Sequence, residues 1–163
     1  MNKKLVDNLN EQTAYELYSA YIYVAMAAYF DSVNLPGFAH WMKVQAKEET
    51  GHAMKFYEYI VDRGEKVVLG PIAKPHDSFS SPQDAFTKAL GHEQKVTARI
   101  NALYEEAKKV KDTATEIMLQ WFISEQVEEE KNATAIIAQL DMIKANAPAL
   151  LMLEQVLAKR GAE

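Results

Sequence analysis

The segment KEETGHA, which runs from Lys47 to Ala53, places Glu49 three residues before His52. Residues three apart in an α-helix lie on the same face, so this spacing aims a carboxylate and an imidazole in one direction. Such oxygen and nitrogen ligands suit iron, manganese or zinc better than copper or calcium. The segment also contains Gly51, although glycine in a helix interior costs about 1 kcal/mol relative to alanine. We therefore expect Gly51 to permit close approach of a neighbouring element.

Glutamates occupy similar places in four amphipathic segments of the chain. Each segment has an apolar stripe with helical period, and one glutamate interrupts each stripe near its middle. These residues are Glu16, Glu49, Glu93 and Glu129. The segments have similar lengths, so we expect the four carboxylates to meet at one level of the core. The stripes contain no Lys or Arg near that level, and His52 supplies at most one positive charge. Because buried carboxylates without cations are strongly disfavoured, the pattern predicts a site for two divalent metal ions.

Helical periodicity and the positions of glycine and proline define the elements that would carry these residues. They predict helices at about 3–31, 38–63, 82–110, 113–144 and 148–160. Gly64 suits the position after a helix end, and Ser81 can cap the third helix with Pro82 at its first position. Thr113 and Glu116 have capping-box spacing at the start of the fourth.

The connections between these helices predict the topology. Short links after the first and third helices favour two antiparallel hairpins, and the segment 65–81 is long enough to cross the length of a bundle. The sequence thus predicts an all-α fold in one domain spanning 1–163: a four-helix bundle with a long crossover between the second and third helices, plus a short C-terminal fifth helix. An irregular all-α fold is the alternative, but helices of about seven turns favour the bundle.

Composition restricts the classes of function. The net charge of −5, without a basic stripe, argues against nucleic acid as a partner. The absence of cysteine excludes disulfides, thiolate zinc sites and iron–sulfur clusters. There is no apolar run of signal-peptide or membrane-spanning length, so we expect a cytoplasmic protein without membrane contact. The fifth segment carries an apolar excess, including Leu151 and Val156, that could pack on its own bundle or on a partner.

Four sequence segments carry a resemblance to a known family. They are LNEQTAYELYSAYIY from Leu9, KEETGHAMKFYEYI from Lys47, GHEQK around Glu93, and WFISEQVEEE from Trp121. Through them the chain resembles the prokaryotic non-haem ferritins over essentially its whole length. That resemblance implies an iron storage protein with ferroxidase activity, which oxidises Fe(II) with dioxygen or hydrogen peroxide. It also implies storage of a ferric oxide-hydroxide mineral in a homo-oligomeric shell of twenty-four subunits.

The resemblance further implies a role for each site residue. The first iron of a di-iron centre would be bound by Glu16, Glu49 and His52, and the second by Glu49, Glu93 and Glu129, with Gln126 close by. A third, more exposed site would comprise Glu48, Glu125, Glu128 and Glu129. Tyr23 and Trp121 match aromatic residues near the centre that could supply electrons.

Two departures separate the chain from related families. Bacterioferritins and rubrerythrins are closer to a pattern with a second Glu-x-x-His motif. In this chain the corresponding place in the fourth helix holds Gln126 and Glu129, with no histidine. Thr50 occupies the place expected of a haem-ligating methionine, so the resemblance implies no haem.

Some readings of the residues stay open. The other histidines do not share the position of His52 beside a glutamate on an apolar stripe. We expect them to be surface or structural residues: His40, His76 and His92. Glu48, Glu125 and Glu128 could equally belong to solvated helix faces. Two other classes of protein remain: a di-metal oxidase or peroxidase that stores nothing, and a helical interaction module whose polar core binds no metal.

Overall fold

The computed structural model describes residues 1–144 and 146–161, which form five α-helices and no strand. The helices are α1 (Lys3–Ser32), α2 (Pro36–Asp62), α3 (Pro82–Lys109), α4 (Thr113–Ile143) and α5 (Ala147–Leu157). The predicted all-α fold is confirmed. The last helix ends at Leu157, before the predicted position 160. The domain predicted over 1–163 includes residues 145, 162 and 163, which lie outside the described part of the chain.

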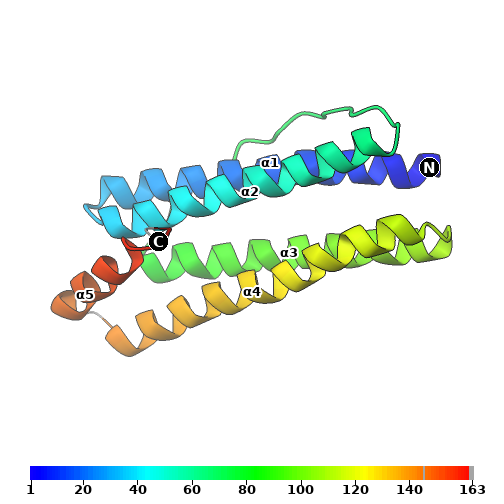
Figure 1. Cartoon of the computed structure of the whole chain (residues 1–163). Helices are drawn as coiled ribbons and strands as arrows, with labels where there is room; N and C mark the ends of the chain where they lie inside the picture. Colours follow the sequence, from blue (N-terminus) through cyan, green and yellow to red (C-terminus); the bar gives the residue numbers. More distant parts are fainter. Residues whose placement is uncertain (145, 162–163) are drawn as a thin grey trace.

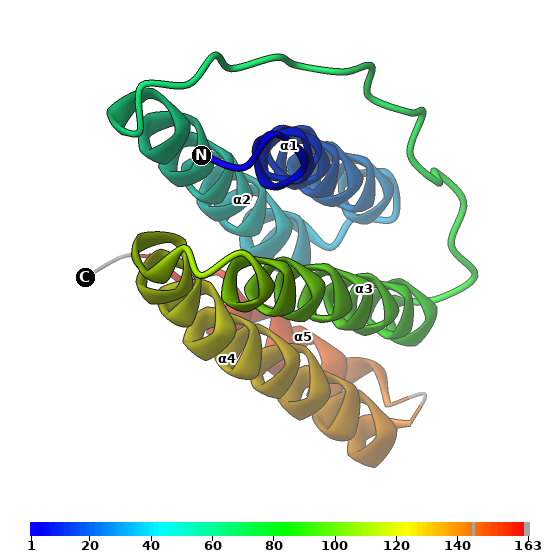
Figure 2. The same ribbon diagram turned by 90° about the vertical axis from the view of Figure 1, so that its right-hand side faces the viewer.

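The four long helices form a bundle of two antiparallel hairpins (Figure 1). α1 pairs with α2 and α3 pairs with α4, while α1 also packs against α3. The crossover from α2 arcs around the outside of α1 before it reaches the start of α3 (Figure 2). α2 and α3 therefore run parallel, as the lengths of the connections predicted.

Buried Asn10 of α1 anchors the crossover to the bundle. Its amide nitrogen Nδ2 donates to the carbonyl oxygen of Lys66 at 3.3 Å, and its Oδ1 accepts from the backbone nitrogen of Val68 at 2.7 Å. Further along, the buried ring of Phe79 packs on Tyr29 with ring centroids 5.2 Å apart. These contacts attach both ends of an otherwise irregular segment to α1.

Local hydrogen bonds define the helix ends. The Ser81 hydroxyl accepts from the backbone nitrogen of Asp84 at 3.1 Å, and Gly64 has the positive φ of 72° expected after a helix end. The expected capping box of Thr113 and Glu116 is wrong. Asp112 caps α4 instead, because its carboxylate reaches the backbone nitrogen of Thr115 at 3.2 Å, which leaves Thr113 as the first helical residue.

Two apolar clusters fill the bundle, one on each side of the level where the stripe glutamates lie. One contains the rings of Phe30, Phe38 and Phe86, and the other contains Phe56 and Phe122, whose stacked rings join α2 to α4 with centroids 4.1 Å apart. In each long helix the stripe glutamate lies between residues of the two clusters. Apolar side chains therefore enclose the polar level from both ends and limit its hydration.

The two glycines of α2 have opposite environments. The expectation for Gly51 is wrong: it is exposed, and an added Cβ would have no heavy atom of the described residues within 4 Å. Gly37 is the glycine at a close approach, because a Cβ there would lie 2.2 Å from the carbonyl oxygen of Glu154 in α5. Its backbone nitrogen also donates to the Glu154 carboxylate at 3.1 Å. Gly37 thus permits α5 to dock on the start of α2.

α5 shows one of the two arrangements that its apolar residues suggested. Leu153 and Leu157 are buried against the bundle, so the segment folds back on its own chain. Leu151, Met152 and Val156 remain exposed. One face of α5 is therefore docked and an apolar face is left open.

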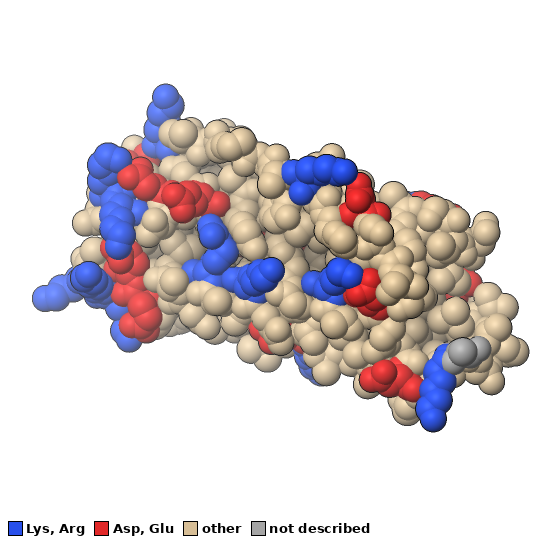
Figure 3. Space-filling view, turned by 180° about the vertical axis from the view of Figure 1, so that it is seen from behind, with Lys and Arg blue, Asp and Glu red and all other residues tan. Residues whose placement is uncertain are grey.

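The surface carries mixed charge on the face seen in Figure 3. Lys and Arg side chains there lie among Asp and Glu side chains and form no continuous basic patch on that face. Among the described residues, no helix combines the length and hydropathy needed to cross a membrane.

Candidate metal centre

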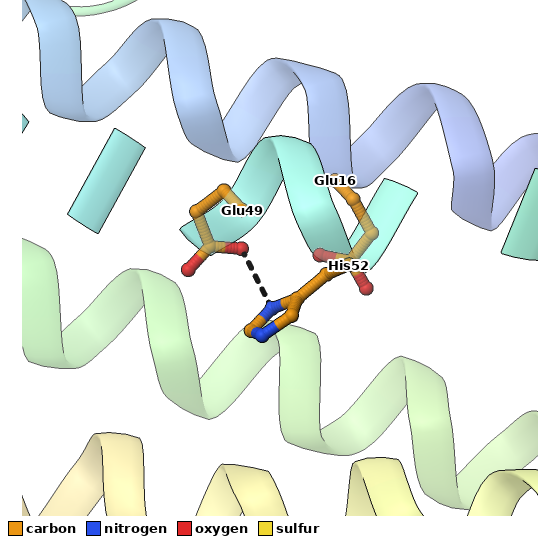
Figure 4. A group of neighbouring side chains, drawn as sticks. All are labelled: Glu16, Glu49 and His52. Carbon is orange, nitrogen blue, oxygen red and sulfur yellow. Dashed lines mark ion pairs between the residues drawn. The ribbon is translucent and has the colours of Figure 1, made fainter. Parts of the chain in front are cut away.

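Glu16, Glu49 and His52 form the first group of possible metal ligands. Glu16 comes from α1, whereas Glu49 and His52 come from successive turns of α2 (Figure 4). One ligand atom from each residue lies within 4.8 Å of the others, and all three side chains are buried. The imidazole Nδ1 of His52 is 3.4 Å from Oε2 of Glu49. The Glu-x-x-His spacing therefore brings both residues to one potential cation position.

His52 also belongs to a second group, with Glu125 and Glu129 of α4. Its other nitrogen, Nε2, is 3.8 Å from Oε1 of Glu125, and the three ligand atoms lie within 4.8 Å of one another. Glu129 is buried, but Glu125 is partly exposed. One imidazole thus lies between a buried acidic group and a more accessible one.

Glu93 lies outside both groups and is held by hydrogen bonds. The hydroxyl of buried Tyr23 donates to Oε1 of Glu93. The amide nitrogen of Gln126 donates to Oε2 at 3.1 Å and to the backbone carbonyl of Glu93 at 3.2 Å. Gln126 is therefore next to Glu93, which it contacts through its donor end.

The remaining acids of the predicted third site have different surroundings. Glu48 forms an ion pair with the guanidinium group of Arg160, near the C-terminus. Glu128 is exposed on α4, next to buried Glu129. The structure thus brings Glu125 and Glu129 to His52, while Glu48 has a cation partner from the same chain.

Two glutamines that sequence reasoning left without a role contact the buried acids. Gln12 donates from Nε2 to Oε1 of Glu16 at 2.8 Å, and Gln45 donates from Nε2 to Oε1 of Glu49 at 3.0 Å. Each glutamine precedes its glutamate by four residues on one helix face, so the sequence did contain a signal. Oε2 of Glu16 and Oε1 of Gln45 are buried and have no hydrogen-bond partner among the described residues.

Arg99 of α3 is the other residue that the sequence did not indicate. Its Nε donates to Oε1 of Gln12 at 2.8 Å, and its guanidinium group lies 4.2 Å from the centre of the Tyr15 ring. Arg99 lies outside the apolar stripe of α3 and donates to Gln12, so the prediction that the stripes hold no Lys or Arg at this level stands. A guanidinium group lies one bridging side chain away from Glu16.

Burial and mutual repulsion alter the proton affinity of the cluster. Burial, reinforced by the charge of Glu49, raises the pKa of Glu16 to about 8 and the pKa of Glu129 to about 7. Burial also raises the pKa of Glu93 well above its usual range. Although burial lowers the pKa of His52, its hydrogen bond with Glu49 and the surrounding carboxylates raise that pKa to about 9. Without a metal ion, the cluster therefore favours bound protons, which a divalent cation would replace.

The other histidines and Trp121 occupy distinct positions. His92 is buried, with Nε2 at 2.7 Å from the hydroxyl of Ser19, and burial lowers its pKa to about 4. His40 and His76 are exposed. The Trp121 ring meets His52 edge-on, with centroids 5.4 Å apart.

The parallel middle helices, the long crossover and the central Glu and His side chains define a ferritin-like bundle. A family model described as a ferritin-like domain matches residues 6–143. The chain belongs to the ferritin family.

The similar proteins include bacterial and archaeal ferritins. The chain is 44% identical over 160 residues to a bacterial non-heme ferritin of Staphylococcus saprophyticus, a match that covers 98% of this chain and 96% of the relative. It is 41% identical over the same length to a bacterial non-heme ferritin of Staphylococcus aureus, again covering 98% and 96%. Among solved structures, an open pore ferritin from the hyperthermophilic archaeon Archaeoglobus fulgidus superimposes with a TM-score of 0.97. It has 44% identity, and the match covers 98% of both chains.

Proposed function

We propose that this protein stores iron and oxidises Fe(II) at the centre formed by its buried carboxylates and His52. One observation carries the proposal: four glutamates are buried at the level of His52, and Gln12, Gln45 and Gln126 donate hydrogen bonds to three of them. Such a cluster binds protons in the absence of metal and offers carboxylate and imidazole ligands to divalent cations that displace them. Relatives named bacterial non-heme ferritins, with 41–44% identity over nearly the whole chain, support iron storage.

In this proposal, two Fe(II) ions are the substrates of an intra-subunit centre. Glu16, Glu49 and His52 bind one ion, while Glu49, Glu93 and Glu129 bind the other. Glu49 is the bridging residue because its charge acts on each of the other three carboxylates. Two Fe(II) and one dioxygen with two protons yield two Fe(III) and hydrogen peroxide; with peroxide as oxidant, the second product is water.

Residues of the centre release protons when Fe(II) binds, and neighbouring aromatic residues can donate electrons. Binding of Fe(II) displaces protons from Glu16 and Glu129, whose pKa values are raised to about 8 and about 7 by burial. Tyr23, hydrogen-bonded to Glu93, is positioned to supply an electron and a proton at that ligand. Trp121, against the edge of His52, is a second electron donor in this proposal.

The accessible acids extend the centre toward the storage cavity. Glu125 and Glu129 share His52 with the first group, so in this proposal a ferric ion passes from the ligand Glu129 to the partly exposed Glu125. Glu48 and Glu128 complete this third site in the proposal. Because Glu48 pairs with Arg160, an ion that binds Glu48 must displace that guanidinium group.

Comparison of two glutamate variants tests the oxidation. Glu49→Ala removes the shared ligand, so rapid oxidation should fall by about a hundredfold. Glu128→Ala changes an exposed side chain about 100° around α4 from Glu129 and should keep the initial fast phase while altering later turnover. Stopped-flow absorbance with a few Fe(II) per subunit measures both. Oxidation by Glu49→Ala at the parental rate, or loss of the first phase in Glu128→Ala, would contradict the assigned centre.

Storage requires a hollow assembly, which we propose to be a shell of twenty-four subunits without haem. The exposed apolar face of α5 is a candidate contact between subunits. Deletion of 148–163 should then yield smaller or altered particles while the bundle keeps its helix content. Light scattering and mineral absorbance after Fe(II) addition in air test this point. A small parental oligomer that oxidises iron would favour the non-storing oxidase, and an unchanged shell after deletion would exclude α5 from assembly. A cytoplasmic location stays a prediction.

A further inference from the structure

A chain of two hydrogen bonds leads from α3 across to the first-group ligand Glu16. Gln12 is fully buried one turn before Glu16, and its Nε2 lies 2.8 Å from Oε1 of Glu16. Arg99 donates from Nε to Oε1 of Gln12, also at 2.8 Å. The guanidinium group rests on the Tyr15 ring, 4.2 Å from its centre, which orients it toward α1.

The two hydrogen bonds that link Arg99, Gln12 and Glu16 can be donated in only one direction. A guanidinium group donates hydrogen bonds and cannot accept them, so it requires the oxygen end of the Gln12 amide. The amide nitrogen must then face Glu16 and donate to Oε1. Arg99 thereby prevents the reversed amide orientation, in which an amide oxygen would face a carboxylate oxygen.

This arrangement leaves the second carboxylate oxygen of Glu16 without a hydrogen bond from the part of the chain that the structure describes. Oε2 is buried and lacks a hydrogen-bond partner among the described residues, whereas Oε1 is occupied by Gln12. Glu16 therefore has one oxygen committed to the protein and one free for a cation in the group with Glu49 and His52.

We infer that Arg99, acting through Gln12, is a positioning residue that makes Glu16 a one-oxygen ligand of the first metal ion. The inference rests on the proposed function of this centre. Because Oε1 is engaged by the Gln12 amide, Glu16 would offer a metal ion its other oxygen, Oε2. The positive charge of Arg99 is separated from Glu16 by the neutral amide, so it orients the ligand without replacing the cation.

Co²⁺ binding to the whole protein tests this role without iron oxidation, because its visible absorption reports coordination geometry. Arg99→Met keeps the side-chain length but removes the hydrogen-bond donor. It should change the Co²⁺ spectrum and weaken Co²⁺ binding by about tenfold, which is the lower end of the range for loss of a ligand's hydrogen-bonding partner. Arg99→Lys restores a donor and should recover most of the affinity. Lys95→Met, an exposed site on the same helix, is the matched control for the lost charge.

A double variant separates positioning from simple attachment of α3 to α1. If Arg99 acts through Gln12, Arg99→Met should have little further effect on Co²⁺ affinity in a Gln12→Met background. An equal effect in both backgrounds would overturn the inference. Should Arg99→Met fail to fold, Gln12→Met decides alone, and unchanged Co²⁺ affinity and spectrum would then refute the role.

The wild-type protein separates this inference from the proposed function. If wild type binds no Co²⁺ in a Glu49-dependent manner, the metal centre fails and the inference fails with it. If wild type binds Co²⁺ but Arg99→Met behaves like Lys95→Met, the centre stands and the positioning role is wrong.

Discussion

Removal of metal should make the stability of this protein fall as pH rises. Around pH 6, folded Glu16 and Glu129 retain protons because their pKa values are raised to about 8 and about 7, whereas unfolded glutamates are ionised. The folded state then binds at least these two additional protons, and Glu93, whose pKa burial also raises, adds to the difference. His92, with its pKa lowered to about 4, opposes this trend below its unfolded value near 6.5. We expect a net loss on the order of 2 kcal/mol per pH unit from pH 6 to 8.

The same range includes a contribution from His52. Its pKa is raised to about 9, so its stabilising proton is fully present below about 6.5 and is lost only as pH approaches 9. His52 therefore adds to the loss of stability between about pH 6.5, where the unfolded histidine loses its proton, and about pH 9. Saturation with Zn²⁺ should flatten or reverse the decline, because the metal replaces the protons that the folded cluster otherwise needs.

Guanidinium chloride unfolding, followed by circular dichroism at fixed subunit concentration, measures this slope in metal-free and Zn²⁺-loaded protein. Glu16→Gln is the matched control: it keeps the side-chain size, cannot bind the proton, and should make the decline shallower below about pH 8. A metal-free stability that is constant or increases over this range, with a parallel curve for Glu16→Gln, would refute the buried acidic cluster.

Two further predictions concern packing and the buried histidine. Gly37→Ala should displace α5, because the new Cβ would lie 2.2 Å from the Glu154 carbonyl oxygen, whereas Gly51→Ala should raise helix stability by up to about 1 kcal/mol. Proteolysis of α5 and thermal unfolding compare the two variants, and equal behaviour of both would contradict the packing. His92→Gln should lose less stability than the parent as pH falls from about 6.5 to about 4, because in that range the unfolded histidine gains a proton while the buried ring stays neutral. Urea unfolding in acid measures the difference, and superimposable pH curves would contradict it.

The sequence predicted those features that depend on local periodicity. Helical period placed Glu16, Glu49 and Glu93 on apolar stripes, and each is buried in the structure. The lengths of the connections were sufficient to predict parallel α2 and α3. Both inferences use only spacing along the chain, which a helix converts directly into position.

Features that depend on contacts between distant segments could not be predicted in this way. Gly51 was expected to lie at a close contact, but which element faces a given turn is decided by tertiary packing, and Gly37 takes that role. Arg99 is 87 residues from Gln12, and Arg160 is 112 residues from Glu48. No periodic pattern links such pairs, because long side chains reach their partners only after the hairpins have packed.

The buried hydrogen bonds explain how the fold can hold its acids and still leave them available to a cation. Glu16 and Glu49 each accept from a glutamine one turn earlier, and Glu93 accepts from Tyr23 and Gln126. Neutral donors orient a carboxylate but do not cancel its charge, whereas a direct Lys or Arg would do both. The nearest guanidinium groups contact a glutamine or the peripheral Glu48. Without metal the cluster offsets the cost of burying its carboxylates by binding protons, and a divalent cation that displaces those protons meets carboxylates already held in place.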